Sequence, residues 1–392
     1  MKVDAHYYGV LAFARACGFK KEAAWSVAYS SQFVDDAKIN QLTIAGPTYG
    51  IDLDCLSPPS LLNMATCHSY TRIKTFNLAA MINNTCAFHF VPGCVGDGFA
   101  WKMACRPRGV IIESIAEEVV SKGDLVTLGI LLHAWADSFA HEGFSGLLSK
   151  VNDINKLNPG RRAYFSTDLI LPGIVLWFRK KVTHKRFDTI FDYMVPAYGH
   201  AQALHYPDEP YMEWSYGYDH KDVYYHGHDG ATVDNRKRYR EAFDSITEIL
   251  DKFLEKHPKY GDPSPPQTPD LFERLYEALL MDARTSRRVK HWQETLKRLK
   301  LLSPQDKKML DYDKGAAWFE EAFTNYDKER FNRRIVRGVL QENFLDSHWY
   351  QYYGAVRWYK ERFHFYADQQ GLAFNHEPYL NTTRGHGKGS TP

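Results

Sequence analysis

The feature that most constrains the fold is an apolar segment that contains three polar side chains at helical spacing. The segment LGILLHAWADSFAHEGFSG, residues 128–146, places His133, Asp137 and His141 four residues apart. At 100° per residue of an α-helix, these side chains fall within an arc of about 80°. An ionised carboxylate in a buried helix is unfavourable unless it is paired or binds a metal. The segment therefore predicts part of a metal site, with a His–Asp hydrogen bond inside a helical core as the alternative.

Further His and Asp residues interrupt apolar or aromatic segments elsewhere in the chain. His89 lies between two phenylalanines, and Asp35 and Asp36 follow Phe33 and Val34. The segment AYGHAQALHYPDEPYMEW adds His200, His205 and Asp208 in an aromatic context. Each residue alone is more often structural, but a zinc or iron centre with nitrogen and oxygen ligands explains all of them together. The candidate metal ligands are His6, Asp35, Asp36, His68, His89, His133, Asp137, His141 and His200.

Two of these candidates, Asp35 and Asp137, are also the candidate catalytic carboxylates. A buried or second-layer carboxylate can accept a proton during hydrolysis. The sequence does not decide which of Asp35 and Asp36 is a ligand.

The hydrophobic pattern is overwhelmingly helical and predicts an all-α fold: a multi-helix globular domain around the metal site, followed by additional C-terminal helices. Before residue 260 we expect helices over 8–17, 21–36, 110–121, 124–141 and about 235–256. Asp124 and Asp234 or Asn235 are the expected N-caps. Residues 40–60 are predicted to form a loop with at most a short hairpin, and residues 215–235 a long loop that is a candidate functional flap. Further helices are expected over 270–280, 284–301, 304–326, 328–343 and 346–368.

Four regions are predicted. Residues 1–260 form the helical metal-binding catalytic domain, and 261–270 form a Pro-rich linker, because prolines cannot extend a helix. Residues 271–375 form the C-terminal helical region, and 376–392 a disordered tail.

Charge and cysteine content narrow the class of protein. A formal net charge of +2 over 392 residues does not indicate general attraction to nucleic acid. The basic stretch RTSRRVKHWQETLKRLK, residues 284–300, is typical of a helix with a charged, solvated face. All six cysteines fall in the first 105 residues without a Cys-x-x-Cys pair, so a thiolate cluster is not expected.

Signals for export and for membrane insertion bear on the expected location of the protein. No apolar run approaches 18 residues, so no transmembrane segment is expected. The N-terminal segment lacks the uninterrupted apolar core of a signal peptide. We therefore expect a cytoplasmic protein with reduced thiols, with export by a signal-independent route as the alternative.

Several of these strings resemble known families. The order of His and Asp residues is similar to that of the zinc-dependent phospholipase C and single-strand nuclease superfamily, which hydrolyses phosphodiesters with three metal ions. The strings HYYG, QFVDD, FHFVPG, HAWADSFAHEGFSG and GHAQALHYPDEPY more closely resemble a microbial domain family of unknown function, over roughly residues 4–250. The resemblance implies as ligands His6, Asp36 or Asp35, His68, His133, Asp137, His141 and His200.

The chain departs from the superfamily pattern at three points. It begins Met1-Lys2 rather than with a processed Trp, the next His lies only four positions after Asp137, and Leu204 stands where an acidic ligand belongs. A site with one or two metals is therefore favoured over three.

The leading functional hypothesis is a metal-dependent hydrolase of a phosphoric ester, similar to a phosphodiesterase or a phospholipase C, with one to three Zn²⁺ ions. Its substrate would be a small-molecule or lipid phosphoester. One alternative is an HD-type di-iron enzyme, either a phosphohydrolase or an oxygenase. Another is a non-enzymatic helical binding protein with a structural metal. The sequence does not reveal the substrate, the metal, the role of the C-terminal helices or the oligomeric state.

Overall fold

The computed structural model describes residues 1–67, 78–160, 197–217, 230–327, 336–372 and 374. Its α-helices are α1 (Val10–Ala16), α2 (Lys21–Asp36), α3 (Leu78–Ala80), α4 (Phe99–Lys102), α5 (Val110–Lys122), α6 (Leu125–Ala140), α9 (Asn235–Lys256), α10 (Leu271–Leu279), α11 (Thr285–Arg298), α12 (Lys307–Leu310), α13 (Ala316–Ala322) and α15 (His348–Gln369). Two π-helices are η1 (Asp4–Gly9) and η3 (Met81–Cys86). Short 3-10 helices are η4 (Lys150–Asn152), η6 (Ala201–Ala203), η7 (Tyr206–Asp208), η8 (Pro258–Tyr260) and η9 (Phe344–Asp346).

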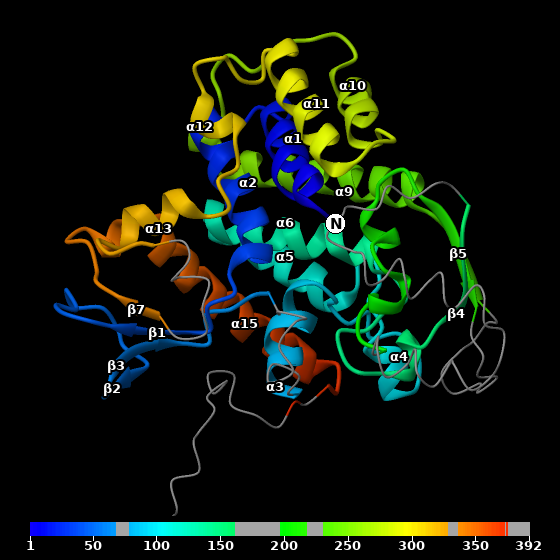
Figure 1. Cartoon of the computed structure of the whole chain (residues 1–392). Helices are drawn as coiled ribbons and strands as arrows, with labels where there is room; N and C mark the ends of the chain where they lie inside the picture. Colours follow the sequence, from blue (N-terminus) through cyan, green and yellow to red (C-terminus); the bar gives the residue numbers. More distant parts are fainter. Residues whose placement is uncertain (68–77, 161–196, 218–229, 328–335, 373, 375–392) are drawn as a thin grey trace, which may run out of the picture.

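Helix α6 lies at the centre of the molecule, where α2, α5, α9, α15 and η1 all contact it (Figure 1). It is apolar on most of its circumference, and every residue from Val126 to Ala140 is buried. As predicted, Asp124 is the N-cap, and its Oδ1 accepts a hydrogen bond from the Val126 backbone N–H at 2.9 Å. The helix ends at His141, the third polar residue of the pattern.

Helix α2 packs closely against α6 because residue 129 is a glycine. A Cβ atom at this position would lie 1.9 Å from Ser30 Oγ and 2.3 Å from the carbonyl oxygen of Val27. The close approach brings the C-terminal end of α2, which carries Asp35 and Asp36, next to the polar face of α6.

Two small sheets lie at opposite sides of the helical core, so the fold is α+β and the predicted all-α fold is wrong (Figure 1). One sheet has the order β2-β3-β1-β7, with β1 (Gln41–Ile44), β2 (Cys55–Leu56), β3 (Pro59–Leu62) and β7 (Val336–Gly338). The other has the order β4-β5-β6, with β4 (Asn155–Pro159), β5 (Glu213–Gly217) and β6 (Gly230–Asp234). Strands of two to five residues are too short to show the alternation by which a strand is recognised in a sequence.

The pairing of the first sheet joins distant parts of the chain. Strand β1 is antiparallel to β3 but parallel to β7, with Leu42 opposite Val336 and Thr43 opposite Arg337. The predicted helix over 328–343 is therefore wrong at 336–338, and residues 328–335 lie outside the described residues. The predicted flap over 215–235 begins in β5 and ends in β6, and its middle, 218–229, also lies outside them.

Most of the predicted helices are confirmed. Gly18, with φ of 96°, separates α1 from α2, and Asp234 caps α9 by accepting from the Arg236 backbone N–H at 2.9 Å. Helices α10 and α11 lie within predicted ranges, and α15 exceeds its predicted range by one residue at its C-terminal end, whereas the predicted helix over 304–326 is broken into α12 and α13. The tail 376–392 lies outside the described residues. Within the described part of the chain, no helix combines the length and apolarity needed to cross a bilayer.

Elements from both sides of the Pro-rich segment 261–270 surround α6. Helix α11 contacts η1, and α15 contacts both α5 and α6. The division of the chain into 1–260 and 271–375 stays a prediction, but the polar face of α6 is enclosed by elements from both regions.

Candidate metal centre

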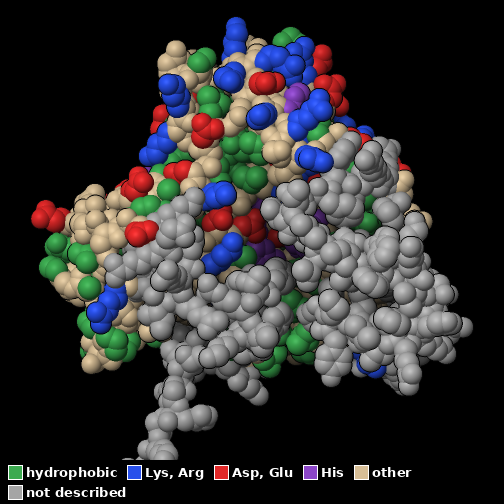
Figure 2. Space-filling model, viewed as in Figure 1, with side chains coloured by type: hydrophobic (Ala, Val, Ile, Leu, Met, Phe, Trp, Pro, Cys, Tyr) green, Lys and Arg blue, Asp and Glu red, His purple; other side chains and the backbone are tan. Residues whose placement is uncertain are grey.

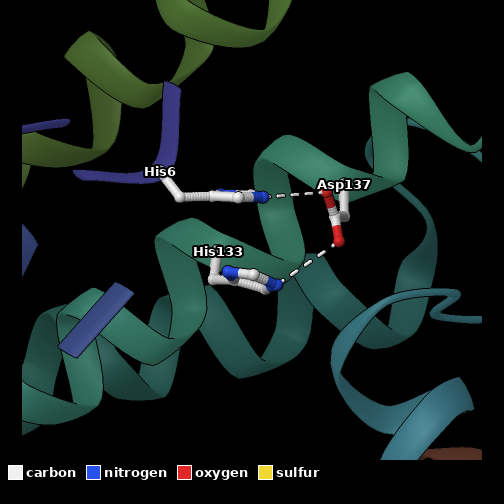
Figure 3. A group of neighbouring side chains, drawn as sticks. All are labelled: His6, His133 and Asp137. Carbon is white, nitrogen blue, oxygen red and sulfur yellow. Dashed lines mark hydrogen bonds and ion pairs between the residues drawn. The ribbon is translucent and has the colours of Figure 1, made fainter. Parts of the chain in front are cut away.

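The first group of polar side chains joins α6 to the N-terminal π-helix η1. His133 and Asp137, one turn apart on α6, are no more than 2% exposed, and His133 Nε2 lies 3.3 Å from Asp137 Oδ2. The His6 ring of η1 lies over the His133 ring and points the same way, and its Nε2 lies 3.1 Å from Asp137 Oδ1 (Figure 3). The His6 and His133 rings are stacked with 3.8 Å between their centroids. Three potential ligand atoms therefore meet in a fully buried position.

The second group shares His133 with the first. His89 follows the π-helix η3, and its Nδ1 lies 3.1 Å from both Asp137 Oδ2 and His133 Nε2. Asp35 of α2 completes the group, because its Oδ1 lies 3.9 Å from His89 Nδ1 and 3.8 Å from His133 Nε2. The Asp35 side chain is 31% exposed, so this group reaches solvent. Acidic and His side chains are visible near the middle of one face of the molecule (Figure 2).

The third group lies at the C-terminal end of α6. His141 Nε2 is 3.1 Å from Asp208 Oδ1, and His200 Nε2 is 3.6 Å from Asp208 Oδ2. His141 Nδ1 is also 3.7 Å from Asp137 Oδ2, so the third group adjoins the first.

Backbone carbonyls fix the orientation of three of these imidazoles. His89 Nε2 donates to the Thr66 carbonyl at 3.1 Å, and His141 Nδ1 donates to the His89 carbonyl at 2.8 Å. His200 Nδ1 donates to the Leu204 carbonyl at 2.7 Å. The other nitrogen of each ring faces a carboxylate, an arrangement that is stable when a cation, either a proton on the ring or a metal ion, lies between them. Metal-binding histidines are typically held in this way.

The imidazoles of His6 and His133 differ from these three in their hydrogen bonding. The Nδ1 atoms of His6 and His133 are buried and have no hydrogen-bond partner in the described part of the structure. The carbonyl-bound rings of His89, His141 and His200 are therefore the stronger indication of a metal site.

The electrostatics of the centre favour ionised carboxylates and differ among the imidazoles. Burial lowers the pKa of His89, but its hydrogen bonds with Asp137 and Cys67 outweigh burial and raise this pKa well above 6.5, so His89 must lose a proton before it binds a metal. Burial, and next the neighbouring His6, lower the pKa of His133 from 6.5 to about 4. Burial also lowers the pKa of His200 to about 4, in spite of Asp208. Burial opposes ionisation of Asp137, but His141 and the other positive groups around it hold its pKa well below the usual range. Neutral imidazole and ionised carboxylate are the forms that bind metals.

A positive group already lies between two of the carboxylates. The Met1 amino group is 2.5 Å from Asp137 Oδ1 and 3.1 Å from Asp208 Oδ1 (N in Figure 1). Burial lowers the pKa of this amino group, but Asp137, Asp208 and Asp35 outweigh that effect and raise it to about 11. The centre therefore stabilises positive charge strongly.

Seven of the nine predicted ligands come together in these groups: His6, Asp35, His89, His133, Asp137, His141 and His200. Asp36 lies apart from them, because its Oδ2 accepts a hydrogen bond from the Tyr312 hydroxyl at 2.8 Å. Burial, and then the neighbouring Asp35, raise the pKa of Asp36. His68 lies outside the described residues.

The ligand set predicted from the sequence lacked Asp208, although its segment was noted as unusual. The superfamily pattern places an acidic ligand four residues after His200, where this chain has Leu204. The chain instead forms the 3-10 helices η6 and η7, separated by Leu204 with φ of 57°, so the carboxylate arrives eight residues after His200. The clustering of His205 and Asp208 in the sequence was the signal that could have indicated Asp208 as a ligand. The His205 side chain is 44% exposed, and its Nδ1 lies 3.8 Å from Asp208 Oδ2.

Comparison with known proteins gives one match. The model of a family of unknown function, DUF6765, matches residues 1–365. The chain belongs to the DUF6765 family. Membership confirms the predicted resemblance to a domain family of unknown function, over a longer range than the predicted residues 4–250.

The same comparisons give the DUF6765 chain no other relative. No curated protein and no solved structure matches it. The comparisons therefore do not link it to the zinc-dependent phospholipase C and single-strand nuclease superfamily. An activity for this DUF6765 member has to be argued from the centre itself.

Proposed function

We propose that the centre binds metal ions and that the chain is a metal-dependent hydrolase of phosphoric esters, with Zn²⁺ as the predicted metal. The observation that carries the proposal is the orientation of His89, His141 and His200. Each donates one ring nitrogen to a backbone carbonyl and turns the other toward a carboxylate. A second hydrogen bond from such a ring to the carboxylate needs an extra proton on the ring, whereas a metal ion bound by both groups serves neutral rings. Burial lowers the pKa of His200 to about 4 in spite of Asp208, which disfavours the extra proton there.

The distances between the potential ligand atoms fit the proposed metal. Ligand atoms about 2.0–2.2 Å from a tetrahedral Zn²⁺ lie about 3.3–3.6 Å from one another. In the first group the two His–Asp distances are 3.1 and 3.3 Å, and in the third they are 3.1 and 3.6 Å. In the second group the distances are 3.1, 3.8 and 3.9 Å. The pairs in the first and third groups involve both oxygens of Asp137 and of Asp208. One ligand atom from each residue of a group lies within 4.8 Å of the others, so each group needs only a small contraction to hold one ion.

The arrangement of the groups supports hydrolysis rather than a purely structural role. Structural zinc sites are closed, whereas Asp35 leaves one side of this centre open to solvent. Adjacent ions, when bound, polarise a phosphoryl oxygen and lower the pKa of a water molecule. Asp35 is the exposed carboxylate of its group and would accept a proton from the attacking water. Asp137, buried among the imidazoles, would keep their nitrogens directed at the centre.

Elemental analysis of the purified chain, combined with a phosphodiesterase assay, tests the proposal. We expect at least one zinc per chain and hydrolysis of bis(p-nitrophenyl) phosphate that stops on chelation and returns when Zn²⁺ is added. A chain that binds no metal after incubation with Zn²⁺ would contradict metal binding. Bound metal without hydrolysis of any phosphoric ester would leave the metal site but exclude the proposed activity. Iron in place of zinc would favour the di-iron alternative.

Asp35 and Asp36 provide a matched pair of variants for the second group. We expect Asp35→Asn to weaken Zn²⁺ binding by about 10–100-fold, because a ligand of the exposed group is neutralised. Asp36→Asn should leave the affinity within about twofold, because Asp36 binds the Tyr312 hydroxyl instead. Competition with a chelating dye measures both affinities. Equal weakening in the two variants would show that the geometric distinction between the neighbouring carboxylates has no consequence.

A further inference from the structure

Arg288 is a fully buried arginine in a helix whose sequence predicted a solvated face. It lies on α11, beyond the Pro-rich segment, with a side chain that is 0% exposed. Its Nε lies 2.6 Å from Asp4 Oδ2 and its Nη2 lies 3.2 Å from Asp4 Oδ1, so the guanidinium binds this carboxylate with two hydrogen bonds. Its Nη1 donates to Glu209 Oε2 at 2.7 Å. One side chain therefore joins three separate segments of the chain.

Both carboxylates that bind Arg288 are close in sequence to candidate metal ligands. Asp4 lies two residues before His6 on the same π-helix η1, and Glu209 directly follows Asp208. The contacts of Arg288 therefore fix the backbone on which one ligand of the first group and one ligand of the third group stand.

The network is balanced in charge. The Lys2 ammonium contacts the other oxygen of Glu209, so two cations face the two carboxylates. Lys2 is 25% exposed, but Arg288, Asp4 and Glu209 are buried. Burying three charges is unfavourable unless the geometry is well defined, and the flat guanidinium fork defines it better than any other cationic side chain. An apolar cluster of similar size would hold the segments together but would not fix their orientation.

We infer that Arg288 is a positioning residue for the metal centre: through Asp4 and Glu209 it holds His6 and Asp208 where they can bind a cation. This inference rests on the proposed function. It assigns to α11 a part in building the centre, although α11 supplies no ligand. Among the described residues, the contacts of Arg288 do not reach the segments of Asp35 or His89, so its effect should be confined to the first and third groups.

The test compares a variant that lacks the buried ion pairs with a matched control. In Asp4→Asn/Glu209→Gln/Arg288→Met, the carboxylates and the guanidinium are removed together, and the Lys2 ammonium that stays is 25% exposed and reaches solvent. The control is Arg15→Met/Asp262→Asn, which removes another buried arginine that links the N-terminal helices to the later part of the chain. Arg15 Nη1 lies 2.9 Å from Asp262 Oδ2, and Arg15 Nε donates to the Leu301 carbonyl at 3.0 Å. Neither Arg15 nor Asp262 contacts a candidate ligand.

Zn²⁺ affinity, the visible spectrum of the Co²⁺-loaded chain and the thermal melt are the readouts. We expect the triple variant to melt cooperatively, to bind its weakest Zn²⁺ about 10–100-fold less tightly than the wild type, and to show an altered Co²⁺ spectrum. The control should keep its Zn²⁺ affinity within about twofold. If the triple variant does not fold, Arg288→Lys, which keeps the charge but loses the fork, takes its place with the same expected direction.

Three outcomes would overturn the inference. A folded variant that binds Zn²⁺ within twofold of the wild type would show that the ion pairs of Arg288 with Asp4 and Glu209 do not position the ligands. A control that loses as much affinity would show that any damaged buried ion pair has this effect. A wild-type chain that binds neither Zn²⁺ nor Co²⁺ would remove the proposed function as well, and this result is distinct from the first two.

Discussion

The Asp137→Asn variant is expected to lose at least about 100-fold in Zn²⁺ affinity, more than the loss typical of residues behind the ligands. Asp137 is the carboxylate common to the whole centre: His6, His89, His133 and His141 all have a ring nitrogen within 3.7 Å of its oxygens. An amide group of the same shape lacks the negative charge and presents N–H groups to some of these nitrogens. Hydrolysis of phosphoric esters should fall with the metal content. Equilibrium dialysis followed by elemental analysis measures the loss.

Asp124→Asn is the matched control for this variant. It makes the same chemical change on the same helix, and asparagine is as good an N-cap as aspartate, so α6 should be unaffected. We expect wild-type metal content in Asp124→Asn. If Asp137→Asn also kept its full metal content, the carboxylate would be an ordinary buried ion-pair partner and the proposed centre would be wrong.

Replacing Gly129 with alanine is expected to destabilise the fold by about 2 kcal/mol or more. Alanine in a helix interior is favoured over glycine by about 1 kcal/mol, but overpacking costs about 1–3 kcal/mol and occasionally more. Here the steric cost should dominate, because the added Cβ would lie 2.3 Å from a backbone oxygen of α2, which cannot move without moving the helix. Ser30 cannot readily turn away either, since its Oγ donates to the Ser26 carbonyl at 2.8 Å.

Gly354→Ala is the control for Gly129→Ala, because it makes the same change inside another helix and we expect it to raise the stability. Gly354 lies inside α15, and a Cβ there would have no atom within 4 Å, so the substitution should stabilise the chain by about 0.5–1 kcal/mol. Chemical denaturation of the two variants gives both free energies of unfolding. Shifts of the same sign would show that helix propensity, and not the α2–α6 contact, decides the stability at residue 129.

The Gly129 variant also connects packing to the metal centre. Asp35 of α2 and His133 of α6 are held 3.8 Å apart only while these two helices stay in close contact. We expect Gly129→Ala to weaken metal binding in the second group more than in the third, because His141, His200 and Asp208 do not depend on α2.

Local sequence signals predicted the helix that builds the centre. The spacing of His133, Asp137 and His141 placed three polar groups on one helix face, and the Asp124 and Asp234 N-caps marked two helix starts. These signals depend on neighbours within about four residues, so they can be recognised in the sequence without knowledge of the fold.

The features that were not predicted depend on contacts that are distant in sequence. Asp35 and Asp36 are equivalent in the sequence, and only the position of Tyr312 separates them. Strand β7 was predicted as helix because three residues carry no periodic pattern, and its partner β1 lies near the other end of the chain. The stretch 284–300 was predicted to form a helix with a charged, solvated face, and nothing in it distinguished Arg288 from the exposed cations. The two carboxylate partners of Arg288 come from segments that the linear pattern does not connect.

The parallel pairing of β1 with β7 has a consequence for biosynthesis. The paired residues Leu42 and Val336 are about 300 positions apart, which ribosomes take roughly 15–60 s to translate. During that interval β1 of the nascent polypeptide is paired with β3 on one edge only. The contact of Asp4 with the Arg288 guanidinium likewise cannot form until residue 288 has been synthesised, so both long-range contacts are made late in translation or after it.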